Sequence, residues 1–223
     1  MQVYVAPEVA EVEALHPYLQ DKAFRALPIR EQLAKQARVL QAAHAAGDQR
    51  VRMHLMSWWP DASSRSLDDI MKAGFGLREA QLTLAREYGF EDWREVDALG
   101  NTALPINFEL ALDDLQAGEI EKLRQRLDKD PQLAIERSAY GHRATLLHYL
   151  GANGVESHRQ RMPLNAAALA GLLLGYGADL DAKANMYGGG HTPYALASSS
   201  AHPHNANISA ELNHVLSGQG LQA

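Results

Sequence analysis

Two stretches of sequence decide the fold: GHRATLLHYLGANG, residues 141–154, and ALAGLLLGYGADLDA, residues 168–182. An insertion separates them. Thr145 can cap a helix through its hydroxyl, and His148, one turn later, can hydrogen-bond back to it. Gly154 suits a tight turn, and Gly177 can end a second helix in the left-handed conformation. The two segments therefore predict an inner helix, a turn and an outer helix.

Two weaker copies of this pattern flank the middle one. Residues 108–127 place Gly118 at the turn but lack the Thr-x-x-His element, as is typical of a terminal capping repeat. Residues 191–216 open with Thr-Pro, have Ala195 in place of the histidine, and end in another helical stretch. Insertions after the turn of the middle copy and at residues 198–207 lengthen the later copies beyond the usual repeat of about 33 residues.

The middle copy closely resembles an ankyrin repeat, with its Thr-x-Leu-His opening, its Asn-Gly turn and its Leu-Leu-Leu helix closed by Gly-Ala-Asp. Residues 30–38 and 80–93 resemble the helical N-terminal extension of a group of bacterial ankyrin-repeat proteins. Together the resemblances cover residues 29–217. They imply an α-solenoid with a helical N-terminal cap, in a class of proteins that usually bind other proteins.

The first hundred residues predict helices without help from the resemblance. Ile29, Leu33, Ala37 and Leu40 share one helical face, because their spacings are four, four and three. Further helices are expected before Pro60, from Ser66 to Gly74, from Leu77 to Gly89 and from Trp93 to Gly100. The three tryptophans Trp58, Trp59 and Trp93 are expected core or interface anchors.

The turn-rich residues 101–105 separate two expected domains, a helical N-terminal unit over 1–100 and ankyrin-like repeats over 101–223. Alternating strands rich in Val, Ile and Thr hardly occur. The predicted fold class is therefore all-α, with a helical N-terminal unit packed on a short ankyrin-like α-solenoid of about three irregular repeats.

Composition excludes several classes of function. The 223 residues include no cysteine, which excludes disulfides, thiolate metal sites and a thiol nucleophile. A net charge of −6 argues against general nucleic-acid binding. No signal peptide is visible, and the longest apolar stretch, residues 166–178, is broken by glycines and too short to span a membrane. We expect a cytoplasmic protein without a membrane partner.

Candidate sites each have a structural alternative. His148 is expected to be a structural hydrogen bonder rather than a base or metal ligand. Residues 187–191, Tyr-Gly-Gly-Gly-His, lack the lysine and helix start of a phosphate loop and favour a hairpin finger between repeats. His191, His202 and His204 lie close in sequence but lack the spacing of a zinc site, so surface histidines are the favoured interpretation.

The predicted function is therefore a non-enzymatic protein-interaction module with an unidentified protein partner and without cofactor, metal or nucleic acid. Its binding surface is expected on exposed residues of the loops and hairpins between repeats. Four other residues are expected to stabilise the repeat fold. One alternative is a metal- or small-ligand-binding protein, enzymatic or not, that uses the histidine-rich third repeat; another is a structural homodimer. The expected binding residues are Tyr140, His142, Arg143, Asn185, Met186, Tyr187 and His191, and the structural ones are Thr145, His148, Gly154 and Gly177.

Overall fold

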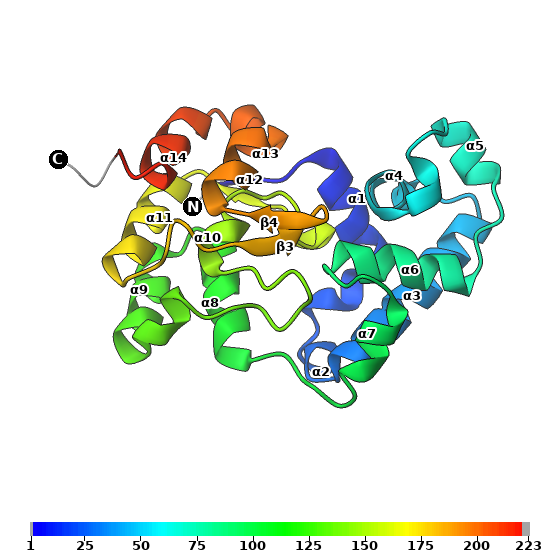
Figure 1. Ribbon diagram of the computed structural model, residues 1–223, viewed down its shortest axis with the longest axis horizontal. Helices are drawn as coiled ribbons and strands as arrows, with labels where there is room; N and C mark the ends of the chain where they lie inside the picture. The colour runs from blue at the N-terminus through cyan, green and yellow to red at the C-terminus, as the bar shows by residue number, and fades with distance from the viewer. Residues whose placement is uncertain (1, 220–223) are drawn as a thin grey trace. The chain divides into compact units, whose positions relative to one another are not determined.

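The computed structural model describes residues 2–219 and is mostly helical, with 61% of these residues in helices (Figure 1). The chain divides into two units. The N-terminal helical unit comprises residues 7–104 and 156–158, and the helix-pair unit comprises residues 2–6, 105–155 and the described chain from 159. Two short segments thus belong to a different unit from their sequence neighbours, which a single division near residue 101 does not anticipate.

The N-terminal helical unit is built around α3, which packs against α6, while α4 packs on the same helix α6. The predicted face of α3 is confirmed, since Ile29, Leu33, Ala37 and Leu40 are all fully buried. The first two helices, which precede this face, were not predicted from the sequence. The helices of this unit are α1 (Pro7–Leu15), α2 (Lys22–Arg25), α3 (Ile29–Ala45), α4 (Arg52–Trp58), α5 (Leu67–Lys72), α6 (Leu77–Glu87) and α7 (Trp93–Ala98).

Local caps set the helix ends in this unit as the sequence indicates. The backbone N–H of Asp69 donates to Ser66 Oγ at 3.2 Å, which caps α5. Trp58 and Trp59 are buried, and Trp93 is half-buried at the start of α7. The unit therefore has an aromatic and aliphatic core of its own.

The helix-pair unit contains three successive pairs of helices at the positions of the three sequence copies. The first helices of the pairs contact one another in the order α8, α10, α12, and the second helices in the order α9, α11, α14. Two rows of helices therefore enclose one continuous apolar core. The helices are α8 (Ile106–Gln116), α9 (Ile120–Lys129), α10 (Leu146–Tyr149), α11 (Ala166–Gly175), α12 (Pro193–Ser199), α13 (Ala201–Asn205) and α14 (Ser209–Leu216).

Four short strands among the described residues depart from a purely helical chain. β1 (Val3–Tyr4) pairs antiparallel with β2 (Met162–Pro163), and β3 (Ala184–Met186) pairs antiparallel with β4 (Gly189–His191). Strands of two or three residues are too short to show an alternating pattern, which is why the sequence does not reveal them. The β3–β4 pair confirms the hairpin expected between the second and third copies.

The two insertions also take definite structures. Residues 198–207 form the end of α12 and the short helix α13, which is capped by Ser200 and contacts α14. The insertion of the middle copy provides β2 and contributes residues 156–158 to the N-terminal helical unit.

Candidate interaction surface on the hairpin

The β3–β4 hairpin turns through Tyr187 and Gly188, which both have positive φ angles of 52° and 76°. Positive φ at both central residues is the signature of the two-residue turn that best fits the twist of a hairpin. The register pairs Asn185 with Gly190 and Met186 with Gly189. The three glycines therefore serve the turn and the second strand.

Tyr187 lies at the turn with 55% of its surface exposed. Its hydroxyl donates to Asn153 Oδ1 at 2.5 Å, and its ring meets the His191 ring edge-on at 6.1 Å between centroids. Gly154 has a φ of 73°, and a Cβ there would come within 2.7 Å of Met186 Sδ and 3.1 Å of the Tyr187 ring. The aromatic side chain is thus accessible and held in place at the same time.

His148 ties the start of α10 to the base of the hairpin. Its Nδ1 accepts the backbone N–H of Thr145 at 3.1 Å and lies 2.8 Å from the Thr145 hydroxyl, as expected from the Thr-x-x-His spacing. Its Nε2 donates to the carbonyls of Ala182 and His191, both at 3.1 Å. Burial lowers the pKa of the imidazole to about 4, although both carbonyls favour its protonated form. His148 is therefore a neutral structural hydrogen bonder at pH 7.

The preceding loop, residues 137–144, is fastened to the hairpin by one backbone hydrogen bond and by hydrogen bonds from the Arg137 side chain to backbone carbonyls. Asn185 N–H donates to the His142 carbonyl at 2.7 Å. Arg137 Nη1 donates to the carbonyl of Arg143 at 2.8 Å and to that of Lys183 at 2.7 Å. The loop and the hairpin therefore form one surface of the helix-pair unit.

The structure divides the seven predicted binding residues into two groups. Arg143, Asn185 and Tyr187 are exposed and His191 is half-buried, so these side chains are accessible. The expected exposure is wrong for three residues that lie in the interior, with exposed fractions of 5%, 0% and 3%: Tyr140, His142 and Met186.

Packing and a local hydrogen bond explain these buried positions. His142 Nδ1 accepts the Ala144 N–H at 3.1 Å, and its ring contacts the rings of Tyr140 and Tyr149. Met186 occupies an inward position of β3, on the opposite side from exposed Asn185. The accessible surface is therefore smaller than predicted.

Three polar residues of this surface were not predicted from the sequence. Asn153 fixes the tyrosine hydroxyl, Arg137 bridges two carbonyls, and Lys183 is an exposed cation beside the hairpin. The aliphatic part of Lys183 lies over Gly190, where a Cβ would be 3.2 Å from Lys183 Cδ. No local signal in the sequence marked them, because Arg137 and Lys183 are 46 positions apart.

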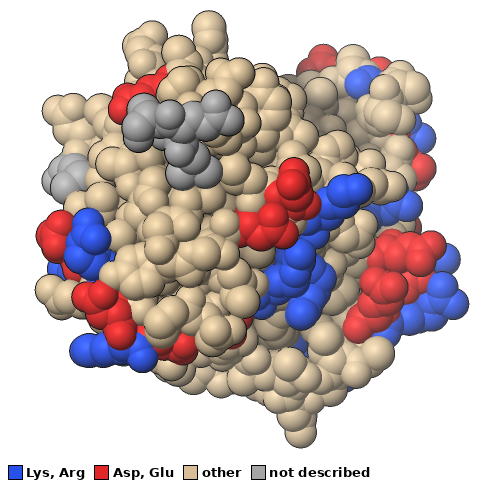
Figure 2. All heavy atoms as spheres, turned by 60° about the vertical axis from the view of Figure 1, so that its left-hand side comes forward, with Lys and Arg blue, Asp and Glu red and all other residues tan. Residues whose placement is uncertain are grey.

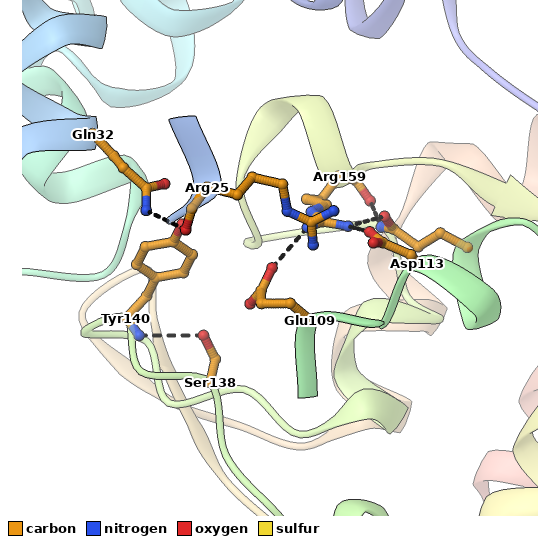
Figure 3. Close-up of polar contacts among 8 residues, drawn as sticks. Arg25, Gln32, Glu109, Asp113, Ser138, Tyr140 and Arg159 are labelled. Atoms are coloured by element: carbon orange, nitrogen blue, oxygen red, sulfur yellow. Dashed lines mark hydrogen bonds and ion pairs between the residues drawn. The ribbon is translucent and has the colours of Figure 1, made fainter. Parts of the chain in front are cut away.

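A buried polar cluster anchors the insertion of the middle copy to α8 (Figure 3). The Arg159 guanidinium donates to Glu109 Oε2 at 2.8 Å, Asp113 Oδ1 at 2.6 Å and Gln116 Oε1 at 3.2 Å. These three acceptors recur at i, i+4 and i+7 and so share one helical face, which is a pattern visible in the sequence. Figure 3 also shows Tyr140 N–H donating to Ser138 Oγ within the neighbouring loop.

The N-terminal helical unit contains a second buried polar group. His54 Nδ1 lies 2.5 Å from Glu87 Oε2, and Glu87 Oε1 accepts the Ser157 N–H at 2.9 Å. Burial alone would raise the pKa of the Glu87 carboxyl, but the His54 charge and the hydrogen bonds from His54 and Ser157 outweigh it and lower the pKa. This carboxylate holds residues 156–158 on the unit.

His16 completes this group, since its ring lies edge-on to that of His54 at 5.3 Å and its Nδ1 is 2.9 Å from the Tyr18 hydroxyl. Burial, followed by the charges of His54, His158 and Arg50, lowers the pKa of His16 well below its ordinary value. His16 is therefore a neutral core residue at pH 7.

The histidines of the third copy are dispersed. His191 lies in β4, His202 is buried near the start of α13, and His204 is exposed on the same short helix. Within residues 2–219, no group of three or more His, Cys, Asp or Glu side chains is arranged to hold a metal ion.

Other surface properties are mixed. On the face drawn in Figure 2, acidic and basic side chains lie side by side, basic atoms form one continuous band, and much of the surface is uncharged. In the part of the chain that the structure describes, no helix is both long and apolar enough to cross a membrane.

No protein-family model, curated protein or solved structure matches the chain.

Proposed function

We propose that this chain is a non-enzymatic protein-interaction module of the ankyrin-repeat type, with its binding surface on the β3–β4 hairpin and the loop before it. The arrangement of the helix-pair unit supports the repeat type. The three sequence copies coincide with the pairs α8–α9, α10–α11 and α12–α14, and the two rows of helices stack in the same order. The Thr145–His148 pair occupies the position that the repeat pattern assigns to it.

The observation that carries the proposal is Tyr187, an exposed aromatic side chain on a fixed hairpin. Tyrosines are enriched at the energetic centres of protein interfaces because they bury a large area with few rotatable bonds. The hydrogen bond to Asn153 and the contact with Gly154 already restrict this ring. Binding would therefore cost little additional side-chain entropy.

A protein partner agrees better with the charge of the chain than a nucleic acid does. The net charge is −6, and much of the face drawn in Figure 2 is uncharged. Nucleic-acid binding draws most of its affinity from neutralising many phosphates. The cytoplasmic setting expected from the sequence belongs to the same proposal.

Affinity capture from the source lysate, quantified by mass spectrometry, tests the proposal with three variants. Tyr187→Ala should reduce recovery of the specific partner by about thirtyfold, equivalent to a loss of about 2 kcal/mol. Tyr187→Phe retains the ring and should keep most of the binding. Ile106→Ala removes a 62% exposed apolar side chain from α8 and serves as the matched control.

Two outcomes would refute the proposed surface. One is recovery of every partner by Tyr187→Ala at the wild-type level, and the other is equal loss in Tyr187→Ala and Ile106→Ala. Sedimentation of the purified protein separately tests the alternative of a homodimer, in which the partner is a second copy of the chain.

A further inference from the structure

Three basic residues gather near the base of the hairpin whose turn carries Tyr187, although the whole chain carries an excess of acidic groups. The Arg137 guanidinium donates to the carbonyls of both Arg143 and Lys183, at 2.8 and 2.7 Å, and so fixes the two backbones next to each other. We call Arg137, Arg143 and Lys183 the basic cluster.

The positive charges of the basic cluster are not neutralised by acidic side chains of the described residues. Within residues 2–219, none of its three side chains forms an ion pair, and their hydrogen bonds go only to backbone carbonyls. Glu136 and Asp181 are the nearest acidic residues in sequence, and neither pairs with the cluster. The cations on α9 differ, because Lys122 and Arg124 each have a glutamate partner at 3.6 and 3.5 Å.

The side chains of the cluster are positioned for a ligand from outside. Arg143 has a φ of 55° and donates from Nη1 to the Ser138 carbonyl at 3.2 Å, which leaves the rest of an exposed guanidinium available. The aliphatic stem of Lys183 lies over Gly190 of β4, and the residue is exposed. Arg offers a planar fork that matches a carboxylate, and Lys adds a point charge.

We infer that the basic cluster recognises carboxylates of an acidic peptide segment in the protein partner, and that Tyr187 packs against an adjacent apolar side chain of that segment. This inference rests on the proposed function, since it names the chemistry of the partner at the same surface. A few carboxylates match the three cations of the cluster, whereas a nucleic acid presents a dense row of phosphates to a chain with a net charge of −6.

The test measures fluorescence anisotropy of a labelled peptide of Glu and Leu residues, with a Gln-and-Leu peptide and a single-stranded oligonucleotide as comparison probes. The double variant Arg143→Gln/Lys183→Gln should bind the Glu peptide about tenfold more weakly than the wild type. The matched control, Lys122→Gln/Arg124→Gln, removes the same charge from α9 and should stay within about twofold. Arg137 is left intact because it bridges two backbone carbonyls.

Several results would overturn the inference. The first is that the wild type does not bind the Glu peptide, and the second is that it binds the Gln peptide as tightly as the Glu peptide. The third is that both double variants bind the Glu peptide equally weakly, and the fourth is that the wild type binds the oligonucleotide more tightly than the Glu peptide. Binding of the Glu peptide should also weaken as salt is raised.

The capture experiment separates this inference from the proposed function. Loss of the lysate partner by Tyr187→Ala with full retention by Arg143→Gln/Lys183→Gln would leave the protein-binding function standing and reject the acidic-peptide chemistry. Full retention by both variants, together with a selective loss of Glu-peptide binding in the double variant, would reject the hairpin as the binding surface for the lysate partner and leave only the affinity of the basic cluster for carboxylates standing.

Discussion

Acidification should destabilise the helix-pair unit through His148, and the size of the effect follows from its surroundings. The side chain is fully buried and its pKa is lowered to about 4, against about 6.5 in an unfolded chain. Protonation would also remove the Nδ1 lone pair that accepts the Thr145 N–H. The stabilising state is therefore the neutral imidazole, which is complete above pH 6.5 and is lost as the pH falls towards 4.

The magnitude can be calculated by linkage. The unfolded chain binds a proton at this histidine below pH 6.5, and the folded chain does so only near pH 4. The free energy of unfolding should therefore fall by about 2 kcal/mol between pH 7 and pH 5 and by about 3 kcal/mol at pH 4, from this residue alone. Other buried histidines, such as His16, add to the total change in the wild type.

A variant isolates the contribution of His148 to the pH dependence of the free energy of unfolding. His148→Ala leaves the Thr145 N–H and the carbonyls of Ala182 and His191 without this partner and should lower stability by about 3 kcal/mol at pH 7. The difference from the wild type should then narrow to about 1 kcal/mol at pH 5. His204→Ala, which removes an exposed side chain from the same unit, should change neither value.

Urea titrations at several pH values, followed by far-UV circular dichroism, measure these differences. Tryptophan fluorescence is a useful internal comparison, because all three tryptophans lie in the N-terminal helical unit. NMR titration of the imidazole protons gives the pKa directly. A constant difference between wild type and His148→Ala from pH 7 to pH 5, or a titration midpoint near 6.5, would refute the reasoning.

Three further predictions concern stability. Gly154→Ala, which forces a Cβ to within 2.7 Å of Met186 Sδ at a φ of 73°, should cost about 2 kcal/mol in thermal denaturation, whereas Gly171→Ala, inside α11 with open space around it, should add about 0.5 kcal/mol. Glu87→Gln cannot accept from both His54 and Ser157 without presenting an amide donor to one of them, and it should cost about 2 kcal/mol at pH 7 by tryptophan fluorescence. Because the folded-state pKa is lowered, this cost should diminish only as the pH falls below the unfolded value of about 4.5, and a cost that has already disappeared above pH 4.5 would contradict the lowered pKa. Arg159→Met removes three hydrogen bonds to acceptors on α8 and should cost about 3 kcal/mol by circular dichroism, and a loss below about 0.5 kcal/mol would show that the cluster is not a stabilising anchor.

Local features of the fold could be predicted from the sequence, because their determinants lie within a few residues of one another. The apolar face of α3, the Ser66 cap of α5 and the Thr145–His148 pair all depend on spacings of three or four residues. The contacts that place the insertion of the middle copy do not depend on such short spacings. Glu109 and Arg159 are 50 positions apart, and Glu87 and Ser157 are 70 positions apart. No local pattern specifies which buried acid meets which distant donor.

The exposure of individual side chains on the candidate surface could not be predicted from the sequence either. The types of residue in the two hairpin and loop segments indicated where a binding surface could lie, but not which side chains face outward. In β3, Ala184 and Met186 point inward while Asn185 points outward, so exposure follows the period of two of a strand. That period could not be applied because the strand itself is only three residues long. Tyr187 lies beyond the strand, in a turn with positive φ, and therefore remains accessible whichever face of the hairpin is buried. Its position in the turn, rather than its residue type alone, is what makes it the strongest candidate for a binding anchor.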